Sequence, residues 1–232
     1  ELVTLLRSEG LRLNEIEFVQ ITPKIDVSSF APMLEAGAGL GAAAVTVSGD
    51  DPDSARLAAN FAALCDLAGS FGLRVDLEFM RWRAVGTLSQ ALAIVRQSGA
   101  ANAAVLVDAL HLSRSGGSPA DLRTVPAQWL RAAQLCDAAA TMPATDAAVV
   151  DEAREGRFPP GEGSLPLGSL LQALPADAAL SVELPMRGRD AVSRIAIAYE
   201  TTQRLLRSLP HGAADKNASA TGRLQEQGTA GA

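Results

Sequence analysis

Val75-Asp76-Leu77-Glu78-Phe79 (residues 75–79) is the stretch that decides the fold, because apolar and acidic side chains alternate strictly along it. Alternation with a period of two predicts a β-strand with one apolar face. The preceding residues, 53–72, repeat apolar side chains at helical spacing and predict a helix. The same order of strand, helix and strand recurs along the chain, which predicts parallel strands joined by helical crossovers.

This pattern divides the whole chain into short strands and longer helices. Strands are predicted at residues 16–21, 42–47, 74–79, 103–108, 132–137 and 180–184, and helices at 53–72, 87–99, from 118 onward, 164–174 and 190–209. Ser118 and Pro119 are favourable as the N-cap and the first residue of a helix. The glycine-rich segment 37–41 superficially resembles the phosphate-binding turn of an open sheet, but it precedes a strand instead of following one. A barrel is therefore favoured over an open doubly wound sheet.

Length, charge and hydropathy exclude several classes of protein. The 232 residues fit one large α/β domain. The net charge of -6 argues against nucleic-acid binding, which needs a basic surface. No apolar run is long enough to span a membrane and the N-terminus does not resemble a signal peptide, so a cytoplasmic protein is expected. Cys65 and Cys136 lie in apolar periodic segments and are expected to be buried, reduced thiols.

Four predicted strands carry a side chain with a metal-binding oxygen at or near the C-terminal end: Glu78, Asp108, Gln134 and Glu183. The apolar residues of each strand have the opposite parity and should face the helices, so these four side chains should point into the barrel. The C-terminal end of a barrel is where enzymes of this architecture build their active sites. The sequence therefore predicts that the four side chains lie together.

Such a cluster favours a divalent metal, because three neighbouring carboxylates repel one another unless a cation neutralises them. Carboxylate and amide oxygens fit Mn²⁺ or Mg²⁺, with Co²⁺ as a further candidate, better than Zn²⁺. The alternative is that each carboxylate is only solvated, which is common at strand ends. The shared position and parity of the four residues favour the metal.

Further candidate residues lie in the segments that follow the strands. His111 follows Asp108 by three residues, and we expect it to relay a proton or bind a substrate oxygen, although a lone histidine is often structural. Arg114, close to a predicted helix start, and Arg157, in the long segment after the fifth strand, are candidates to bind a phosphate or carboxylate of the substrate. Glu162 lies in that same segment and is a third candidate for substrate binding. For Arg114, a turn that caps a helix is an equal alternative.

Five motifs carry a resemblance to a known family. They are Leu77-Glu78-Phe79, Val107-Asp108-Ala109-Leu110-His111, Gln134-Leu135-Cys136-Asp137, Arg157-Phe158-Pro159-Pro160-Gly161-Glu162-Gly163 and Ser181-Val182-Glu183. Together they resemble the xylose isomerase-like TIM barrel superfamily, in its branch of sugar phosphate isomerases and epimerases, over about residues 11–207. The resemblance implies a (β/α)8 barrel whose last four strands supply the metal ligands, here Glu78, Asp108, Gln134 and Glu183. The third ligand is usually a histidine in this superfamily, and a glutamine there is similar to its 3-dehydroshikimate dehydratases.

The resemblance also implies that the first two strand–helix units of the barrel are absent. If Glu183 lies on the eighth strand, the strand at 16–21 is the third, and residues 1–10 are the end of the second helix. Six strands cannot close an eight-stranded barrel, so a fragment or short gene model is favoured over a partner that covers the open edge. We expect the barrel domain at residues 1–209 and a disordered tail at 210–232, which is rich in small and polar residues.

The implied function is a divalent-metal-dependent isomerase or epimerase of a sugar or sugar phosphate, working through an enediolate that the metal stabilises. Glu78 and Glu183 would remove and return the proton, and His111 would bond a substrate oxygen. One alternative is a metal-dependent lyase resembling 3-dehydroshikimate dehydratase, and another is a non-catalytic barrel remnant. The expected partner is a small molecule, either a sugar, a sugar phosphate or a related polyhydroxy acid. A homo-oligomer is left open, and no nucleic-acid or membrane partner is expected.

Overall fold

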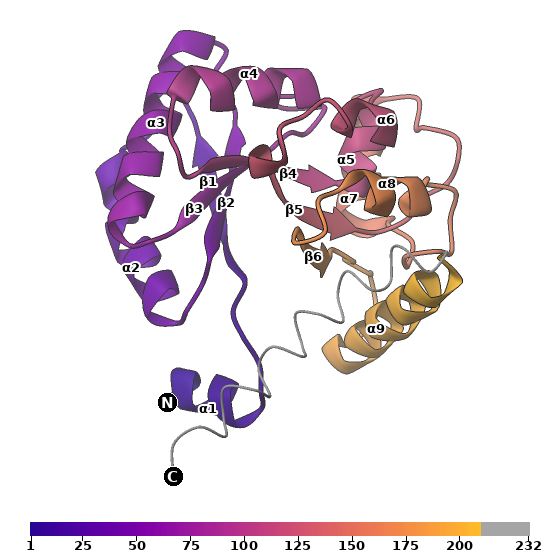
Figure 1. Cartoon of the computed structure of the whole chain (residues 1–232). Helices are drawn as coiled ribbons and strands as arrows, with labels where there is room; N and C mark the ends of the chain where they lie inside the picture. The colour runs from indigo at the N-terminus through magenta and orange to yellow at the C-terminus, as the bar shows by residue number, and fades with distance from the viewer. Residues whose placement is uncertain (210–232) are drawn as a thin grey trace.

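The computed structural model describes residues 1–209, and the tail predicted to be disordered, 210–232, lies outside the described residues. The centre of the fold is one parallel six-stranded sheet in the order β1-β2-β3-β4-β5-β6, curled into part of a barrel (Figure 1). β1 and β6 each pair with one neighbour, so the described sheet does not close on itself. The predicted fold, a TIM-type barrel represented by six strands, is confirmed.

The elements follow one another as alternating strands and helices. The strands are β1 (Glu15–Ile21), β2 (Ala44–Gly49), β3 (Arg74–Glu78), β4 (Ala103–Asp108), β5 (Leu130–Leu135) and β6 (Ala179–Val182). The α-helices are α1 (Leu2–Ser8), α2 (Ala31–Gly39), α3 (Ser54–Ser70), α4 (Leu88–Ser98), α5 (Ala109–Arg114), α6 (Pro119–Leu122), α7 (Asp146–Glu155), α8 (Leu167–Ala173) and α9 (Ala191–Ser208). Two short 3-10 helices, η1 (Val27–Phe30) and η2 (Ala127–Trp129), precede α2 and β5.

Local capping signals explain where the longer helices begin and end. The carboxylate of Asp53 accepts two backbone N–H groups in the first turn of α3. The hydroxyl of Thr87 accepts the N–H of Gln90 at the start of α4. Gly99 ends α4 with a φ of 64°, a left-handed conformation that glycine adopts without steric cost. These positions agree with the predicted bounds of both helices.

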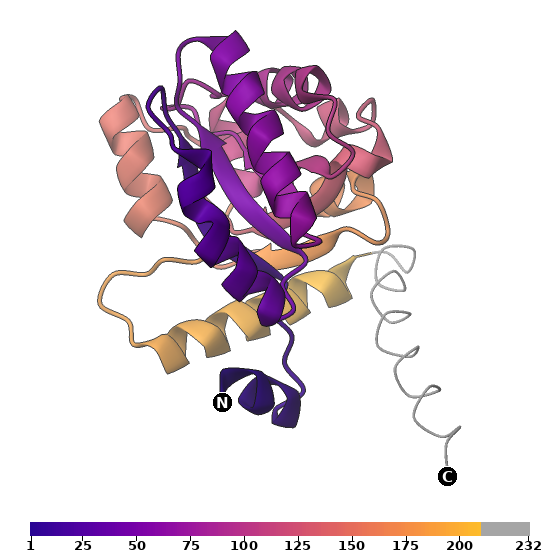
Figure 2. The same cartoon turned by 90° about the vertical axis from the view of Figure 1, so that its left-hand side faces the viewer.

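The apolar core lies between the outer face of the sheet and the helices that connect the strands, as Figures 1 and 2 show for α2, α3 and α4. Leu77 and Val107, which have the parity predicted to face the helices, belong to this core. Leu106, with the same parity as Asp108, is also fully buried but does not belong to it, because its side chain faces the inside of the curled sheet. Cys65 and Cys136 are buried and free, as expected.

Several elements differ from the prediction. β2 begins two residues later than predicted and β5 two residues earlier, so Asp137 lies beyond the end of its strand. The helix that starts after Ser118 is only four residues long, and α8 begins at Leu167, directly after Pro166. α5 and α7 were not predicted, and no bounds were predicted for α2. In α7 only two residues are buried, which leaves little apolar periodicity to detect.

The open side of the sheet leaves apolar residues in contact with solvent. In α9, Val192, Ile195 and Tyr199 are each more than half exposed, and Leu2 and Leu5 of α1 are also exposed. Figure 2 shows α9 crossing below the sheet and α1 lying apart from the other helices. Among residues 1–209, no helix is both long enough and apolar enough to cross a membrane.

Candidate metal centre and active site

The carboxyl ends of β3 to β6 meet around one pocket. Glu78 is the last residue of β3, Asp108 is the last residue of β4, and the backbone of Asp108 is in register with Gln134 of β5. Glu183 directly follows β6. A pocket of about 250 Å³ opens here, and the residues that line it include Glu17, Glu78, Trp82, Arg83, His111, Gln134, Arg154, Arg157 and Glu183. Asp108 is fully buried behind it.

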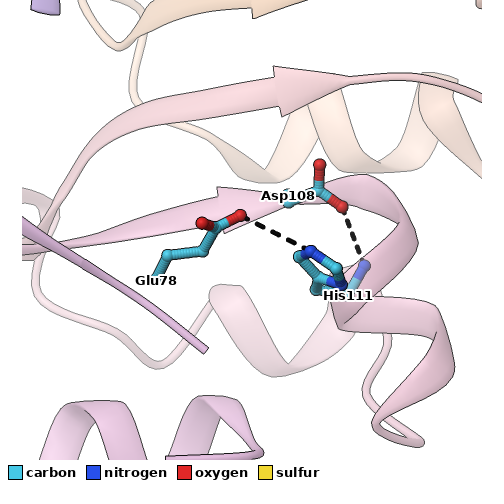
Figure 3. A group of neighbouring side chains, drawn as sticks. All are labelled: Glu78, Asp108 and His111. Carbon is cyan, nitrogen blue, oxygen red and sulfur yellow. Dashed lines mark hydrogen bonds and ion pairs between the residues drawn. The ribbon is translucent and has the colours of Figure 1, made fainter. Parts of the chain in front are cut away.

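Glu78, Asp108 and His111 form the buried centre of the site, and each offers a ligand atom within 4.8 Å of the other two (Figure 3). Asp108 is the N-cap of α5, and its Oδ1 accepts the backbone N–H of His111 at 2.8 Å. The helix turn thereby directs the imidazole towards β3, where Nε2 lies 3.6 Å from Oε1 of Glu78. Trp82 packs edge-on against the imidazole, with 5.1 Å between the ring centroids.

Arg157 is the buried cation of the site. Its guanidinium pairs with Asp108 and, at 3.0 Å, with Glu183, while Nε donates to the carbonyl of Ala153. Two backbone hydrogen bonds between Asp137 and Phe158, of 2.8 and 2.7 Å, hold the segment that carries Arg157 against the end of β5. Arg157 therefore reaches the carboxylates from a segment that is fixed to the sheet.

The protonation states of the site follow from burial and from the neighbouring charges. Burial raises the pKa of Glu78 well above its ordinary value, and the carboxylates of Asp108 and Glu183 raise it further. Burial also raises the pKa of Glu183 to about 7, against the effect of Arg157. Burial disfavours the charged form of Asp108 too, but Arg157 and His111 outweigh it and lower its pKa. Burial lowers the pKa of His111 to about 4, so its imidazole is neutral at pH 7.

The donor set fits a divalent metal. Two buried oxygens of residues that line the pocket, Oε1 of Glu78 and Oε1 of Gln134, lack a hydrogen-bond partner among the described residues. Buried polar atoms in proteins are normally paired, and a missing ion is one of the usual reasons for an exception. Arg157 pairs with Asp108 and Glu183 but not with Glu78, and a bound cation would favour the ionised forms of the two carboxyl groups whose pKa is raised, Glu78 and Glu183.

The residues predicted to bind substrate take three different positions. Arg157 lines the pocket, as described above. Arg114 is buried away from it and donates to both carboxylate oxygens of Glu152, at 2.7 and 2.8 Å, and to the carbonyl of Ala139. Glu162 does not line the pocket and lies 3.7 Å from Arg204 of α9. Internal contacts therefore occupy Arg114, and Glu162 faces α9, so neither of the two residues lines this pocket.

Two residues of the pocket were not predicted as functional. Arg154 is exposed, lines the pocket and forms no ion pair with any residue among 1–209, so it is available to a substrate anion. Arg154 lies near the end of α7, a helix that was not predicted, and Arg157 lies beyond that end, so helical spacing does not relate the two side chains. Glu17 reaches the pocket from β1 and accepts a hydrogen bond from Gln134 of β5. No local pattern in the sequence indicates a contact between residues so far apart.

Comparison with known proteins places the chain in a family. A family model described as the xylose isomerase-like TIM barrel matches residues 24–209, and the chain belongs to this family. A curated 3-dehydroshikimate dehydratase from Pseudomonas putida is 30% identical over 105 residues. The match covers 45% of this chain and 16% of that relative, so the chain corresponds to only a small part of the dehydratase.

Solved structures have the same fold. A fusion protein of a xylose isomerase-like TIM barrel and 4-hydroxyphenylpyruvate dioxygenase is similar with a TM-score of 0.77 and 23% identity, over 88% of this chain and 35% of the fusion. The IOLI protein with a bound zinc atom has a TM-score of 0.71 and 20% identity, over 87% and 80% of the two chains. The 3-keto-D-glucoside 4-epimerase YcjR from E. coli has a TM-score of 0.68 and 16% identity, over 88% and 82%. The proteins to which the chain is similar thus include a dehydratase and an epimerase.

Proposed function

We propose that this protein is a divalent-metal-dependent lyase that removes water from a polyhydroxy keto acid similar to 3-dehydroshikimate. The observation that carries the proposal is the neutral, buried imidazole of His111 beside Glu78, in a pocket that is also lined by Arg154 and Arg157. A neutral imidazole can accept a proton from carbon, and the arginines favour a substrate with a carboxylate. The dehydratase relative and Gln134 at the third donor position support the same reaction.

The four residues Glu78, Asp108, Gln134 and Glu183 would hold the cation, which fits Mn²⁺ or Mg²⁺ by its oxygen donors, with Co²⁺ as a further candidate. When bound, it would act as a Lewis acid towards a substrate carbonyl. Arg154 would bind the substrate carboxylate, because it is exposed at the pocket and free of other ion pairs within residues 1–209. Arg157 would favour the ionised forms of Asp108 and Glu183, since it pairs with both.

The chemistry is then a proton transfer followed by loss of the β-hydroxyl group. His111 takes the proton from the carbon next to the ketone, and the electron pair of that C–H bond forms the enolate. The enolate re-forms the ketone, its electron pair makes the new C=C bond, and the C–O bond of the β-hydroxyl breaks. The leaving oxygen takes the proton back from His111 and departs as water. Trp82 and Glu78 hold the imidazole in position for both transfers.

A second candidate is a sugar isomerase or epimerase. The pKa of Glu183 is about 7, and that of Glu78 is also raised, so at neutral pH one carboxyl group can hold a proton while the other accepts one. Such a pair can remove a proton from a substrate carbon and return one to the neighbouring carbon or to the opposite face. Similarity in fold to a 3-keto-D-glucoside 4-epimerase supports this candidate.

The test compares 3-dehydroshikimate with a panel of ketoses and 3-keto sugars, using protein loaded with Mn²⁺. We expect dehydration of the acid, followed by the ultraviolet absorbance of the conjugated product. His111→Asn should lower kcat by about a hundredfold or more, whereas Arg154→Met should mainly raise KM. Turnover of the sugars without turnover of the acid would favour the second candidate. No turnover of any substrate by protein with bound metal would contradict both.

A further inference from the structure

The amide of Gln134 is held in one orientation. Its Nε2 donates to Oε1 of Glu17 at 3.1 Å, while its own Oε1 is buried and lacks a hydrogen-bond partner among the described residues. Gln134 is only 4% exposed and lies in β5, whereas Glu17 is exposed and lies in β1. The contact therefore joins the two sides of the curled sheet across the pocket.

We propose that Glu17 is a positioning residue that keeps the amide oxygen of Gln134 directed at the metal. The inference rests on the proposed function, because it requires a cation at the site. A glutamine amide has an acceptor end and a donor end of nearly the same shape, and only the oxygen end can bind a metal. A carboxylate accepts hydrogen bonds and donates none when ionised, so Glu17 can pair only with the NH₂ end of Gln134.

A glutamine ligand can turn its NH₂ group towards the metal, whereas both ends of a carboxylate are oxygens. The hydrogen bond to Glu17 prevents this rotation. Without Glu17, a rotation about the last side-chain bond would place the NH₂ group towards the cation, which repels it. Residues that orient a ligand through a hydrogen bond typically change metal affinity by about 10–100-fold when they are removed. Removal of Glu17 should change the metal affinity by a similar factor. Glu17 would act through Gln134, without touching the metal or the substrate.

Two other roles for Glu17 make different predictions. As a direct metal ligand, Glu17 would need its charge, and its loss would weaken binding whether or not Gln134 is present. As a distant negative charge, it would behave like Glu15, which lies two residues earlier on the same strand. Glu15 contacts Thr46 and not Gln134, so it provides a matched control.

The experiment measures the Kd for Mn²⁺ by calorimetric titration of the purified chain and its variants, with electron paramagnetic resonance of free Mn²⁺ as a second readout. Glu17→Ala should weaken binding by about tenfold or more. Glu17→Gln keeps an acceptor oxygen but adds an NH₂ group that can pair with the amide oxygen of Gln134, so it should weaken binding, by less than Glu17→Ala. Glu15→Ala should stay within about twofold. In the Gln134→Ala background, Glu17→Ala should have almost no further effect, because the two residues act as one unit.

Each result has one meaning. A loss of affinity in Glu17→Ala that does not occur in Glu15→Ala, and that disappears in the Gln134→Ala background, supports the positioning role. An equal loss in Glu15→Ala, or a loss that persists in the Gln134→Ala background, overturns it. Unchanged affinity in Glu17→Ala also overturns it and leaves the metal site intact. A folded wild-type protein that does not bind Mn²⁺ instead contradicts the proposed function from which the inference starts.

Discussion

Asp137 and Glu78 are both buried carboxylates near the carboxyl ends of strands, yet their surroundings differ. Asp137 is 1% exposed, and its carboxylate accepts the backbone N–H groups of Ala138, Gly161 and Leu165 at 2.8 to 3.0 Å. Glu78 is 4% exposed, and its Oε1 lacks a hydrogen-bond partner among residues 1–209. Asp137 thus fixes the segment that carries Arg157, whereas Glu78 faces a pocket.

The difference separates carboxylates that stabilise the fold from carboxylates that are available to a ligand. A buried carboxylate whose hydrogen-bonding capacity is filled by backbone groups stabilises the fold and has little capacity left for a ligand. A buried carboxylate with an unpaired oxygen destabilises the isolated fold, and proteins keep such groups where a ligand supplies the partner. Substitutions at the two sites should therefore have opposite effects on stability.

The largest expected effect comes from Asp137→Ala. The substitution leaves three backbone N–H groups without an acceptor, one in a buried and two in partly buried surroundings, and a fully buried group of this kind costs about 1–3 kcal/mol. We expect the free energy of unfolding to fall by about 4 kcal/mol, measured by urea denaturation followed by circular dichroism. Asp137→Asn keeps one acceptor oxygen and should lose less. A fall below 1 kcal/mol for Asp137→Ala would show that the loop is held by other contacts.

A smaller loss is expected from Gly163→Ala, which tests the same loop from its other side. A Cβ at this position would lie 2.4 Å from Oδ1 of Asp137 and 2.5 Å from the carbonyl oxygen of Ala138. Because one of these neighbours is backbone, the loop must shift, at a cost of about 2 kcal/mol. The matched control is Gly168→Ala in α8, where the added Cβ meets only the side chain of Leu209. Equal stability of the two variants would contradict the tight packing around Asp137.

The smallest effect, with the opposite sign, is expected from Glu78→Gln in metal-free protein. Burial raises the pKa of Glu78, so its ionised form destabilises the fold at pH 7, and a neutral amide of similar shape removes that cost. The free energy of unfolding should rise by about 1 kcal/mol, while the additional stability that Mn²⁺ gives the wild type should be lost. Destabilisation by more than 1 kcal/mol would place Glu78 in the same structural class as Asp137.

The sequence predicted the parts of the fold that depend on local patterns. β4 has the predicted bounds, and α3 and α4 start at their predicted caps, because alternation and capping are set by neighbouring residues. The end of β5 was placed two residues too late, since the apolar run continues to Cys136 while the backbone of Asp137 already pairs with Phe158. A contact with a distant residue sets the end of β5, and a local sequence pattern does not indicate such a contact.

The candidate site, like the fold, could be predicted from the sequence only where local patterns determine it. The parity of Glu78, Asp108 and Gln134 predicts their common direction, and the structure places them around one pocket or directly behind it. Whether an arginine is free or paired depends on contacts from distant segments, as Arg114 shows by its pairing with Glu152. The role proposed for Glu17 depends on a contact with a residue 117 positions away, so only the curled sheet reveals it.

The central claim, that the strand ends form a divalent-metal centre, is tested most directly by titrating the metal-free chain with Mn²⁺ by calorimetry. The account predicts one bound ion per chain in the wild type and a loss of at least about a hundredfold in affinity in Asp108→Ala and Glu183→Ala, because each removes a proposed ligand. Circular dichroism confirms that each variant is folded. A folded wild-type chain that binds no Mn²⁺, Mg²⁺ or Co²⁺, or variants that bind as tightly as the wild type, would contradict the claim.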